Sequence, residues 1–142
     1  MHSLLSDCPK FAELVEKYFS FLEGYGFKRS PEYEVTSGTL CQVVYLGKNV
    51  AITVYLDVRD NYVGVTVTKV LEGVLKDSLQ GGFHADLGAY LRKRGRFRKI
   101  PVRQLSSPIE TALAAWADYL QLEGKEILAD LPESLSLADR PD

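Results

Sequence analysis

The chain has 142 residues, of which 46% are hydrophobic and 25% charged, and its formal net charge is -2 at pH 7. This is the size and composition of one globular domain, large enough to bury roughly two thirds of the surface that the unfolded chain would expose. The longest apolar stretches, such as Val50 to Leu56, are too short to cross a bilayer, which excludes a membrane-spanning helix. We therefore expect one domain over residues 1–142, with a frayed tail at 133–142.

The start of the chain and its two cysteines indicate a cellular location. Residues 1–7 have neither a basic start nor a long apolar segment, so they do not resemble a secretory signal. Cys8 and Cys41 show neither the disulfide framework of small secreted domains nor a metal-ligand spacing. We expect both thiols to be reduced and the protein to be cytoplasmic.

An amphipathic helix is predicted near the N-terminus. Pro9 suits its first turn, where a missing N–H costs nothing, and Gly24 and Gly26 end it, so that Phe27 can fold back on its last turn. Apolar residues recur three and four apart along this segment and define one helix face. These residues are Phe11, Leu14, Val15, Tyr18, Phe19, Leu22 and Tyr25.

Alternating residues from Glu32 to Val70 predict a four-stranded antiparallel meander. Residues two apart in a strand share a face, and each hairpin decides which residues lie opposite one another. The first hairpin can turn at Gly47-Lys48 or at Lys48-Asn49, and the second turns through Asp60-Asn61. With either loop in the first hairpin, and also in the second hairpin, odd-numbered residues of one strand lie opposite even-numbered residues of the next. One face of the sheet should form the core, and it carries Cys41, Val43, Tyr45, Val50, Ile52, Val54, Leu56, Val63, Val65 and Val67.

The first strand of the meander tests this assignment of alternate residues to the two faces of the sheet. A two-residue turn at Ser37-Gly38 would aim Glu32 and Glu34 into the core, whereas the loop Ser37-Gly38-Thr39 would aim Tyr33 and Val35 there. Burying unpaired carboxylates is much the costlier choice. We therefore predict the longer loop, with Gly38 at positive φ.

The C-terminal part of the chain is predicted to be helical. Residues 71–83 cannot be assigned, and Asp86 is expected to cap a short helix that ends at Gly95. The sequence from Ser107 to Glu110 matches a capping box with proline at the first helical position, and the helix should run to about Asp130 with Trp116 in the core. The expected fold is α+β and two-layered: the four-stranded meander with the N-terminal and C-terminal helices packed on one face.

Catalytic, metal and cofactor sites are not indicated. A Cys41–His84–Asp86 triad is conceivable, but Cys41 falls on the expected core face and no nucleophile signature surrounds it. The cysteines and histidines are not spaced as metal ligands, and no glycine pattern opens a helix to hold a phosphate. We expect a protein that is not an enzyme and that binds no cofactor or metal.

A basic segment is one candidate binding region. No acidic residue occurs from Leu87 to Ile109, so the rest of the chain is markedly acidic. The segment can be a solvated helix end, a site for an acidic protein or other anion, or, with Phe97 stacking on a base, a nucleic-acid site. Its basic residues are Arg92, Lys93, Arg94, Arg96, Arg98, Lys99 and Arg103.

The second face of the sheet is the other candidate region. It is more apolar than contact with water requires, and it can be a plain solvated surface, a homodimer contact or a site for another protein. Tyr55 would supply contact area, and Asp57 would set the register with a charged partner. This face also carries Gln42, Ala51 and Gly64. The residues predicted to bind a partner are Leu40, Val44, Thr53, Tyr55, Asp57, Thr66 and Thr68.

Three stretches give the chain a resemblance to a group of small, largely uncharacterised bacterial proteins, some of which are similar to immunity proteins encoded beside secreted toxins. The stretches are Tyr18 to Phe27, Val54 to Arg59 and Asp86 to Leu91, and the similarity would span about Phe11 to Leu131. The resemblance implies a cytoplasmic antitoxin that covers the active surface of a toxin. It implies no catalytic residues.

The expected function is therefore a non-enzymatic protein-binding module of the immunity type. Its partner would be another protein, such as a toxin, or a second copy of the chain in a homodimer. The alternative is a nucleic-acid-associated regulator that uses the basic segment 92–103. An enzyme is the third choice, and a pocket holding His84 with Cys41 or an acid would favour it.

Overall fold

The computed structural model describes residues 8–31, 34–37, 40–60, 62–71, 74–75, 84–88, 92 and 108–129. Its helices are α1 (Cys8–Phe19), α2 (Phe21–Gly24), α4 (Pro108–Glu123) and α5 (Lys125–Leu128). Its strands are β1 (Lys28–Arg29), β2 (Val35–Ser37), β3 (Leu40–Leu46), β4 (Val50–Asp57), β5 (Tyr62–Leu71), β6 (Val74–Leu75) and β7 (His84–Asp86).

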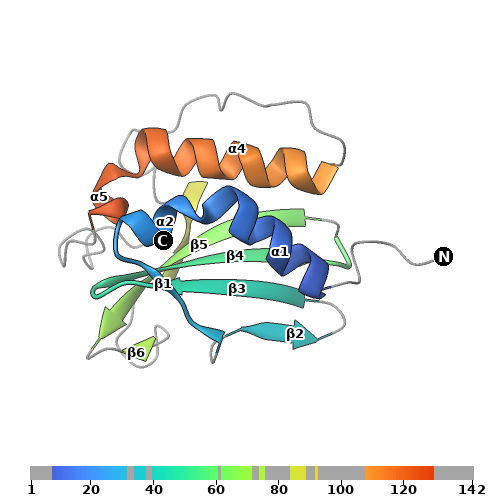
Figure 1. Ribbon diagram of the computed structural model, residues 1–142, viewed down its shortest axis with the longest axis horizontal. Helices are drawn as coiled ribbons and strands as arrows, with labels where there is room; N and C mark the ends of the chain where they lie inside the picture. The colour runs from blue at the N-terminus through green and yellow to red at the C-terminus, as the bar shows by residue number, and fades with distance from the viewer. Residues whose placement is uncertain are drawn as a thin grey trace.

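The strands form an antiparallel sheet that α1 and α4 cover on one face (Figure 1). Strands β2, β3, β4 and β5 are neighbours in that order, which confirms the predicted meander and the two-layer α+β fold. Three short strands were not predicted: β1 pairs with β3, and β6 and β7 pair with β5. Each is only two or three residues long, so it leaves too little alternation to be recognised in the sequence.

The two central hairpins have the predicted parity. Tyr45 pairs with Ile52 across β3 and β4, and Val54 pairs with Val65 across β4 and β5. Every residue assigned to the core face, from Cys41 to Val67, is at most 6% exposed and belongs to one hydrophobic cluster with the helices. The aliphatic face is therefore the helix-covered face, as predicted.

The predicted register of the first strand is wrong. Thr36 pairs with Cys41 and Val35 pairs with Gln42, so even residues of β2, and not Val35, share the face of Cys41. By strand alternation Glu34 lies on the helix-covered side, and its side chain is only 10% exposed. The buried carboxylate of Glu34 is tolerated because Arg29 donates two hydrogen bonds to it. The prediction had assumed that this carboxylate would be unpaired. Residues 38 and 39, and with them the predicted conformation of Gly38, lie outside the described residues.

The predicted N-terminal helix is divided into α1 and α2. Phe11, Val15 and Phe19 of α1 are buried, whereas Tyr25, assigned to the same face, is 52% exposed beyond the end of α2. The turn after α2 places Gly26 at a φ of 94°, a left-handed conformation that favours glycine. Phe27 then folds back as predicted: its amide donates to the carbonyl of Leu22 over 3.1 Å, and its side chain is buried.

Helix α4 begins at the predicted residue and is hydrogen-bonded to both the sheet and α1. Its Trp116 indole N–H donates to the carbonyl oxygen of Val63 on β5 over 3.0 Å, and the hydroxyl of Tyr18 on α1 donates to Oε1 of Glu110 over 2.8 Å. The helix stops at Glu123, and after Gly124 the chain continues as α5, so the predicted single helix is interrupted there.

None of the helices that the structure describes is both long and apolar enough to span a membrane.

Candidate functional site

Two tyrosine rings lie next to each other on the sheet face opposite the described helices. Tyr55 comes from β4 and Tyr62 from the start of β5, and their ring centroids are 6.0 Å apart with an interplanar angle of 53°. Tyr62 is 45% exposed and Tyr55 is half-buried. Both side chains project from paired strands, so a partner would meet a fixed aromatic surface.

The position of the Tyr55 ring depends on the absence of a side chain at Gly64, its cross-strand partner. A Cβ atom at residue 64 would lie 2.5 Å from the hydroxyl oxygen and 2.6 Å from Cζ of Tyr55. The ring therefore covers the glycine, an arrangement by which aromatic residues compensate for glycine in strands.

Two carboxylates accompany the tyrosines. Asp57 pairs with Tyr62 across β4 and β5, and Asp86 of β7 pairs with Thr66, which places both aspartates on the tyrosine face. Oδ1 of Asp57 accepts the amide N–H of Asp60 over 3.2 Å and so fixes the turn between β4 and β5. We call Tyr55, Tyr62, Asp57 and Asp86 the tyrosine–aspartate patch.

Burial and the neighbouring groups of the patch raise the pKa values of both phenols. Burial is the largest of the causes that together raise the pKa of Tyr55 to about 12, and the electrostatic influence of Tyr62, Asp86 and Asp57 acts in the same direction. Burial and the charge of Asp86 likewise raise the pKa of Tyr62. Both rings are therefore neutral hydrogen-bonding groups at physiological pH.

Burial restricts how much of the predicted partner-binding face can be reached. Val44 has no exposed surface, and Thr53, Thr66 and Thr68 are 8%, 7% and 8% exposed, respectively. The expectation of a wide uncovered panel is therefore wrong for these four residues. Leu40, Tyr55 and Asp57 keep intermediate exposure, and of these only Tyr55 and Asp57 belong to the tyrosine–aspartate patch.

Sequence reasoning missed Tyr62 and Asp86. The signal for Tyr62 was present, because it lies two residues before Gly64 and must share its face if β5 starts at residue 62. Asp86 carried no such signal, since it was assigned to a helix cap and β7 was not predicted. The helical residues Leu87 and Gly88 do begin directly after Asp86.

The conceivable catalytic triad is not assembled. Cys41 lies on the helix-covered face, whereas Asp86 lies on the opposite face of the same sheet. Cys41 is also bonded to Cys8, so it holds no free thiol. Among the residues that the structure describes, no group of three or more His, Cys, Asp or Glu side chains could hold a metal ion.

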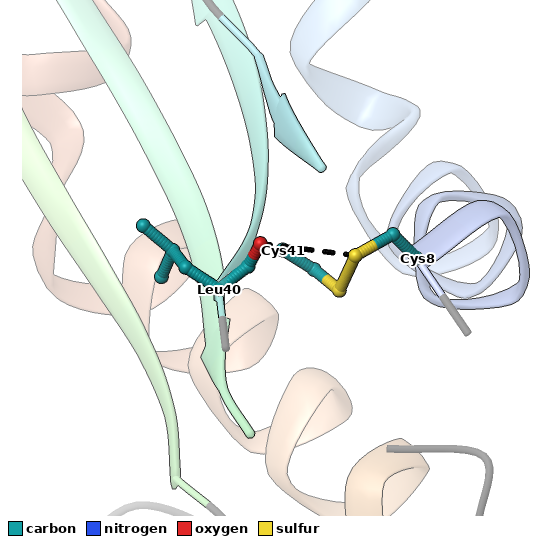
Figure 2. Close-up of a disulfide and its surroundings, with 3 residues drawn as sticks. All are labelled: Cys8, Leu40 and Cys41. Carbon is teal, nitrogen blue, oxygen red and sulfur yellow. Dashed lines mark hydrogen bonds between the residues drawn. A yellow bond between two sulfur atoms is a disulfide. The ribbon is translucent and has the colours of Figure 1, made fainter. Parts of the chain in front are cut away.

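The disulfide corrects the expectation of two reduced thiols. Cys8 begins α1 and Cys41 lies in β3, and the bond joins them across the two layers with their Cα atoms 5.2 Å apart (Figure 2). No spacing rule marks this pair in the sequence, because the contact between Cys8 and Cys41 depends on how α1 packs across the sheet. A structural disulfide is typical of oxidising compartments.

A cavity of about 240 Å³ lies beside the disulfide and is lined by α1, β3 and an ion pair. Nε and Nη2 of Arg29 donate to the two carboxylate oxygens of Glu34 over 2.8 and 2.9 Å, and Nη1 donates to Glu16 over 2.8 Å. The hydrogen bonds from Arg29 to Glu34 raise the pKa of Arg29 above its ordinary value. This guanidinium is fully engaged by protein carboxylates, so the cavity shows no built anion site.

The predicted basic segment is not tested by the structure. Arg92 is described and is exposed, whereas Lys93, Arg94, Arg96, Arg98, Lys99 and Arg103 lie outside the described residues. Its possible anion, acidic-partner or nucleic-acid site therefore stays a prediction from the sequence.

Comparison of the chain with protein-family models, with curated proteins and with solved structures finds no match.

Proposed function

We propose that this chain is a non-enzymatic protein-binding module whose contact surface is the tyrosine–aspartate patch. The observation that carries the proposal is the pair of tyrosine rings on the sheet face opposite α1 and α4, with Tyr62 nearly half exposed. Tyrosine offers a large contact area at a small cost in conformational entropy and is enriched at the energetic centres of interfaces.

The chemistry of the patch favours a basic partner. Asp57 carries negative charge beside the rings, and the face of a tyrosine ring attracts cations. An Arg or Lys side chain of a partner could therefore lie against a ring while a carboxylate oxygen of Asp57 accepts a hydrogen bond from it. In such interfaces the charges mainly accelerate association, and the buried aromatic groups supply most of the affinity.

The proposed partner is a toxin, as the resemblance to immunity proteins implies. A toxin that cuts nucleic acid must hold a polyanion with basic residues, and an acidic, aromatic surface would cover such a site. This proposal places the protein in the cytoplasm, where its target would act. The disulfide between Cys8 and Cys41 is the observation that weighs against a permanently reducing location.

The test is binding to the toxin-like product of a neighbouring gene, measured by titration calorimetry. Replacing Tyr55 and Tyr62 together by alanine should weaken the complex by on the order of 30-fold or more, because truncating an interface anchor typically costs about 2 kcal/mol or more. Tyr25→Ala is the matched control, since Tyr25 is 52% exposed on a different surface. An unchanged affinity in the double variant, with its melting temperature retained, would remove the patch from consideration.

Self-association is measured on the same variants by sedimentation equilibrium. A dimer that is lost in the Tyr55 and Tyr62 double variant but kept in Tyr25→Ala would identify the partner as a second copy of the chain.

The nucleic-acid alternative has its own test: reversing the charges of Arg94, Arg96 and Arg98 should lower both the affinity for a DNA duplex and the salt dependence of that affinity. Absence of duplex binding by the unmodified chain would eliminate this alternative.

A further inference from the structure

The two sulfur atoms of the disulfide have different environments. Cys41 is 1% exposed and belongs to the hydrophobic cluster of the sheet. Cys8, in contrast, is partly exposed and is the first residue of α1 (Figure 2). A thiol in solution can therefore approach Sγ of Cys8 much more readily than Sγ of Cys41.

The cavity beside the disulfide gives an incoming thiol room. It is partly open, has a volume of about 240 Å³, and is lined by both cysteines together with apolar groups of Pro9, Phe11 and Val43. Because the cavity opens to solvent, a small thiol can reach the disulfide through it. The accessible sulfur and the cavity therefore lie on the same side of the sheet.

The start of α1 stabilises the product of reduction. The unpaired N–H groups of a helix N-terminus favour a negative charge, and cysteines placed there are commonly reactive as thiolates. The first turn of this helix of 12 residues contains no acidic side chain. In the protonated form, the Cys8 thiol has an acceptor within reach, because its Sγ lies 3.8 Å from the carbonyl oxygen of Leu40 (Figure 2).

The rest of α1 is held without the disulfide. Phe11, Val15 and Phe19 are buried against the sheet, at 2%, 0% and 0% exposure. The hydroxyl of Tyr18 is bonded to Glu110 of α4, and Glu16 is bonded to Arg29. Breaking the bond between the cysteines should therefore release only the residues of α1 before Phe11 and leave the fold in place.

We propose that Cys8–Cys41 is a reversible thiol–disulfide exchange site, with Sγ of Cys8 as the atom that an external dithiol attacks. One thiolate of the dithiol forms a bond to Sγ of Cys8, the Cys8–Cys41 bond breaks, and Cys41 leaves as a thiolate that takes up a proton. The second thiol of the dithiol, after losing its proton, attacks the mixed disulfide and releases Cys8 as a thiolate. The protein gains two electrons and, once the Cys8 thiolate has also been protonated, two protons, and the dithiol becomes a disulfide.

This site reconciles the disulfide with a cytoplasmic protein. Disulfides in reducing compartments are usually transient and report the redox state of their surroundings. Oxidation ties the start of α1 to β3, and reduction frees Cys8 and Pro9 beside the cavity that they line. The inference does not depend on the tyrosine–aspartate patch, which lies on the other face of the sheet.

The first test uses the unmodified chain and dithiothreitol. After partial reduction without denaturant, thiols are trapped with N-ethylmaleimide and the labelled peptides are identified by mass spectrometry. Cys8 should be labelled on the order of tenfold faster than Cys41, and the far-ultraviolet circular dichroism should not change. Resistance of the bond to dithiothreitol until the chain unfolds, or loss of the dichroism on reduction, would show a purely structural bond and overturn the proposal.

The second test uses two matched single variants and glutathione disulfide. Cys41→Ser retains Cys8 and should form a mixed disulfide with glutathione readily, whereas Cys8→Ser retains the buried Cys41 and should react on the order of tenfold more slowly. The reduced unmodified chain should re-form its internal bond under the same conditions. In this reaction the retained cysteine attacks glutathione disulfide, so equal rates in the two variants, or faster reaction at Cys41, would contradict Cys8 as the accessible sulfur of the pair.

Discussion

The ring of Tyr55 occupies the space that a side chain at Gly64 would need, so the residue at position 64 controls where this aromatic group lies. The two residues are direct cross-strand partners on β4 and β5, and a Cβ at residue 64 would meet three atoms of the phenol at 2.5 to 2.8 Å. The rigid backbone of two paired strands cannot move away cheaply. The ring must therefore leave if the glycine is replaced.

Gly64→Ala should displace the Tyr55 ring toward solvent. Because burial is the main reason for the pKa of about 12, this pKa should fall toward the ordinary value of 10, as measured by the ultraviolet absorbance of tyrosinate. The free energy of unfolding should change by only about 1 kcal/mol or less, since alanine is better than glycine in a strand and offsets part of the lost contact. Binding to a partner should weaken.

The control for this prediction is a double-mutant cycle. When Tyr55 is already alanine, replacing Gly64 by alanine should cause no further loss of stability or of partner binding, because the atoms it would meet are gone. An unchanged Tyr55 pKa in Gly64→Ala would show that the ring is held by something other than its contact with the glycine.

The ion pair between Arg29 and Glu34 should be worth more than a surface salt bridge. The side chains are only 28% and 10% exposed, and two hydrogen bonds of 2.8 and 2.9 Å join them. Glu34→Gln should lower the free energy of unfolding by about 1–3 kcal/mol, as measured by urea denaturation, because it leaves the guanidinium partly buried with a weaker partner.

Two further variants separate the effect of pairing from that of charge. Replacing Arg29 by Met and Glu34 by Leu together should cost less than the sum of the two single changes, since no charge is left without its partner. Oε1 of the exposed Glu16 also accepts a hydrogen bond from Arg29. Glu16→Gln should therefore lower the free energy of unfolding by at most about 0.5 kcal/mol. A loss in Glu16→Gln as large as in Glu34→Gln would contradict the ranking by burial.

The residues of β3, β4 and β5 were assigned correctly to the two faces of the sheet, because side chains in a strand alternate with a period of two and turn residues mark both hairpins. The same reasoning failed at Glu34 because its partner Arg29 lies in β1, which has only two residues and no readable pattern. It failed for Cys8 and Cys41 because their contact depends on the packing of a helix on a strand 33 residues later. Local patterns thus predicted faces, whereas pairings between distant short elements needed the tertiary structure.

Loss of the disulfide should lower stability without unfolding the protein. The bond spans 33 residues, for which the chain-entropy relation gives about 3–4 kcal/mol of stabilisation. The Cys8→Ser, Cys41→Ser double variant should therefore unfold at a lower urea concentration, yet stay folded in buffer because the buried face of α1 remains in contact with the sheet. Its far-ultraviolet dichroism in buffer should match that of the unmodified chain, and a disordered spectrum would contradict this.

Tyr45 should make the protein less stable at high pH. It is 1% exposed in the core, and its pKa is raised to about 12, mainly by burial and also by the charge of Glu16, against the opposing charge of Arg29. The unfolded chain loses this proton near pH 10, whereas the folded chain holds it to about pH 12, so the stabilisation is complete below pH 10 and is lost as the pH rises through 12. The free energy of unfolding should fall by roughly 1–2 kcal/mol over this interval.

Tyr45→Phe is the variant that isolates this effect. Within the part of the chain that the structure describes, the Tyr45 hydroxyl is buried without a hydrogen-bond partner, so its removal should raise the free energy of unfolding by up to about 1 kcal/mol at pH 7. Between pH 10 and 12, urea denaturation of this variant should show a shallower loss of stability than the unmodified chain. An equally steep loss would assign the pH dependence to Tyr55 and Tyr62, whose pKa values are also raised by burial.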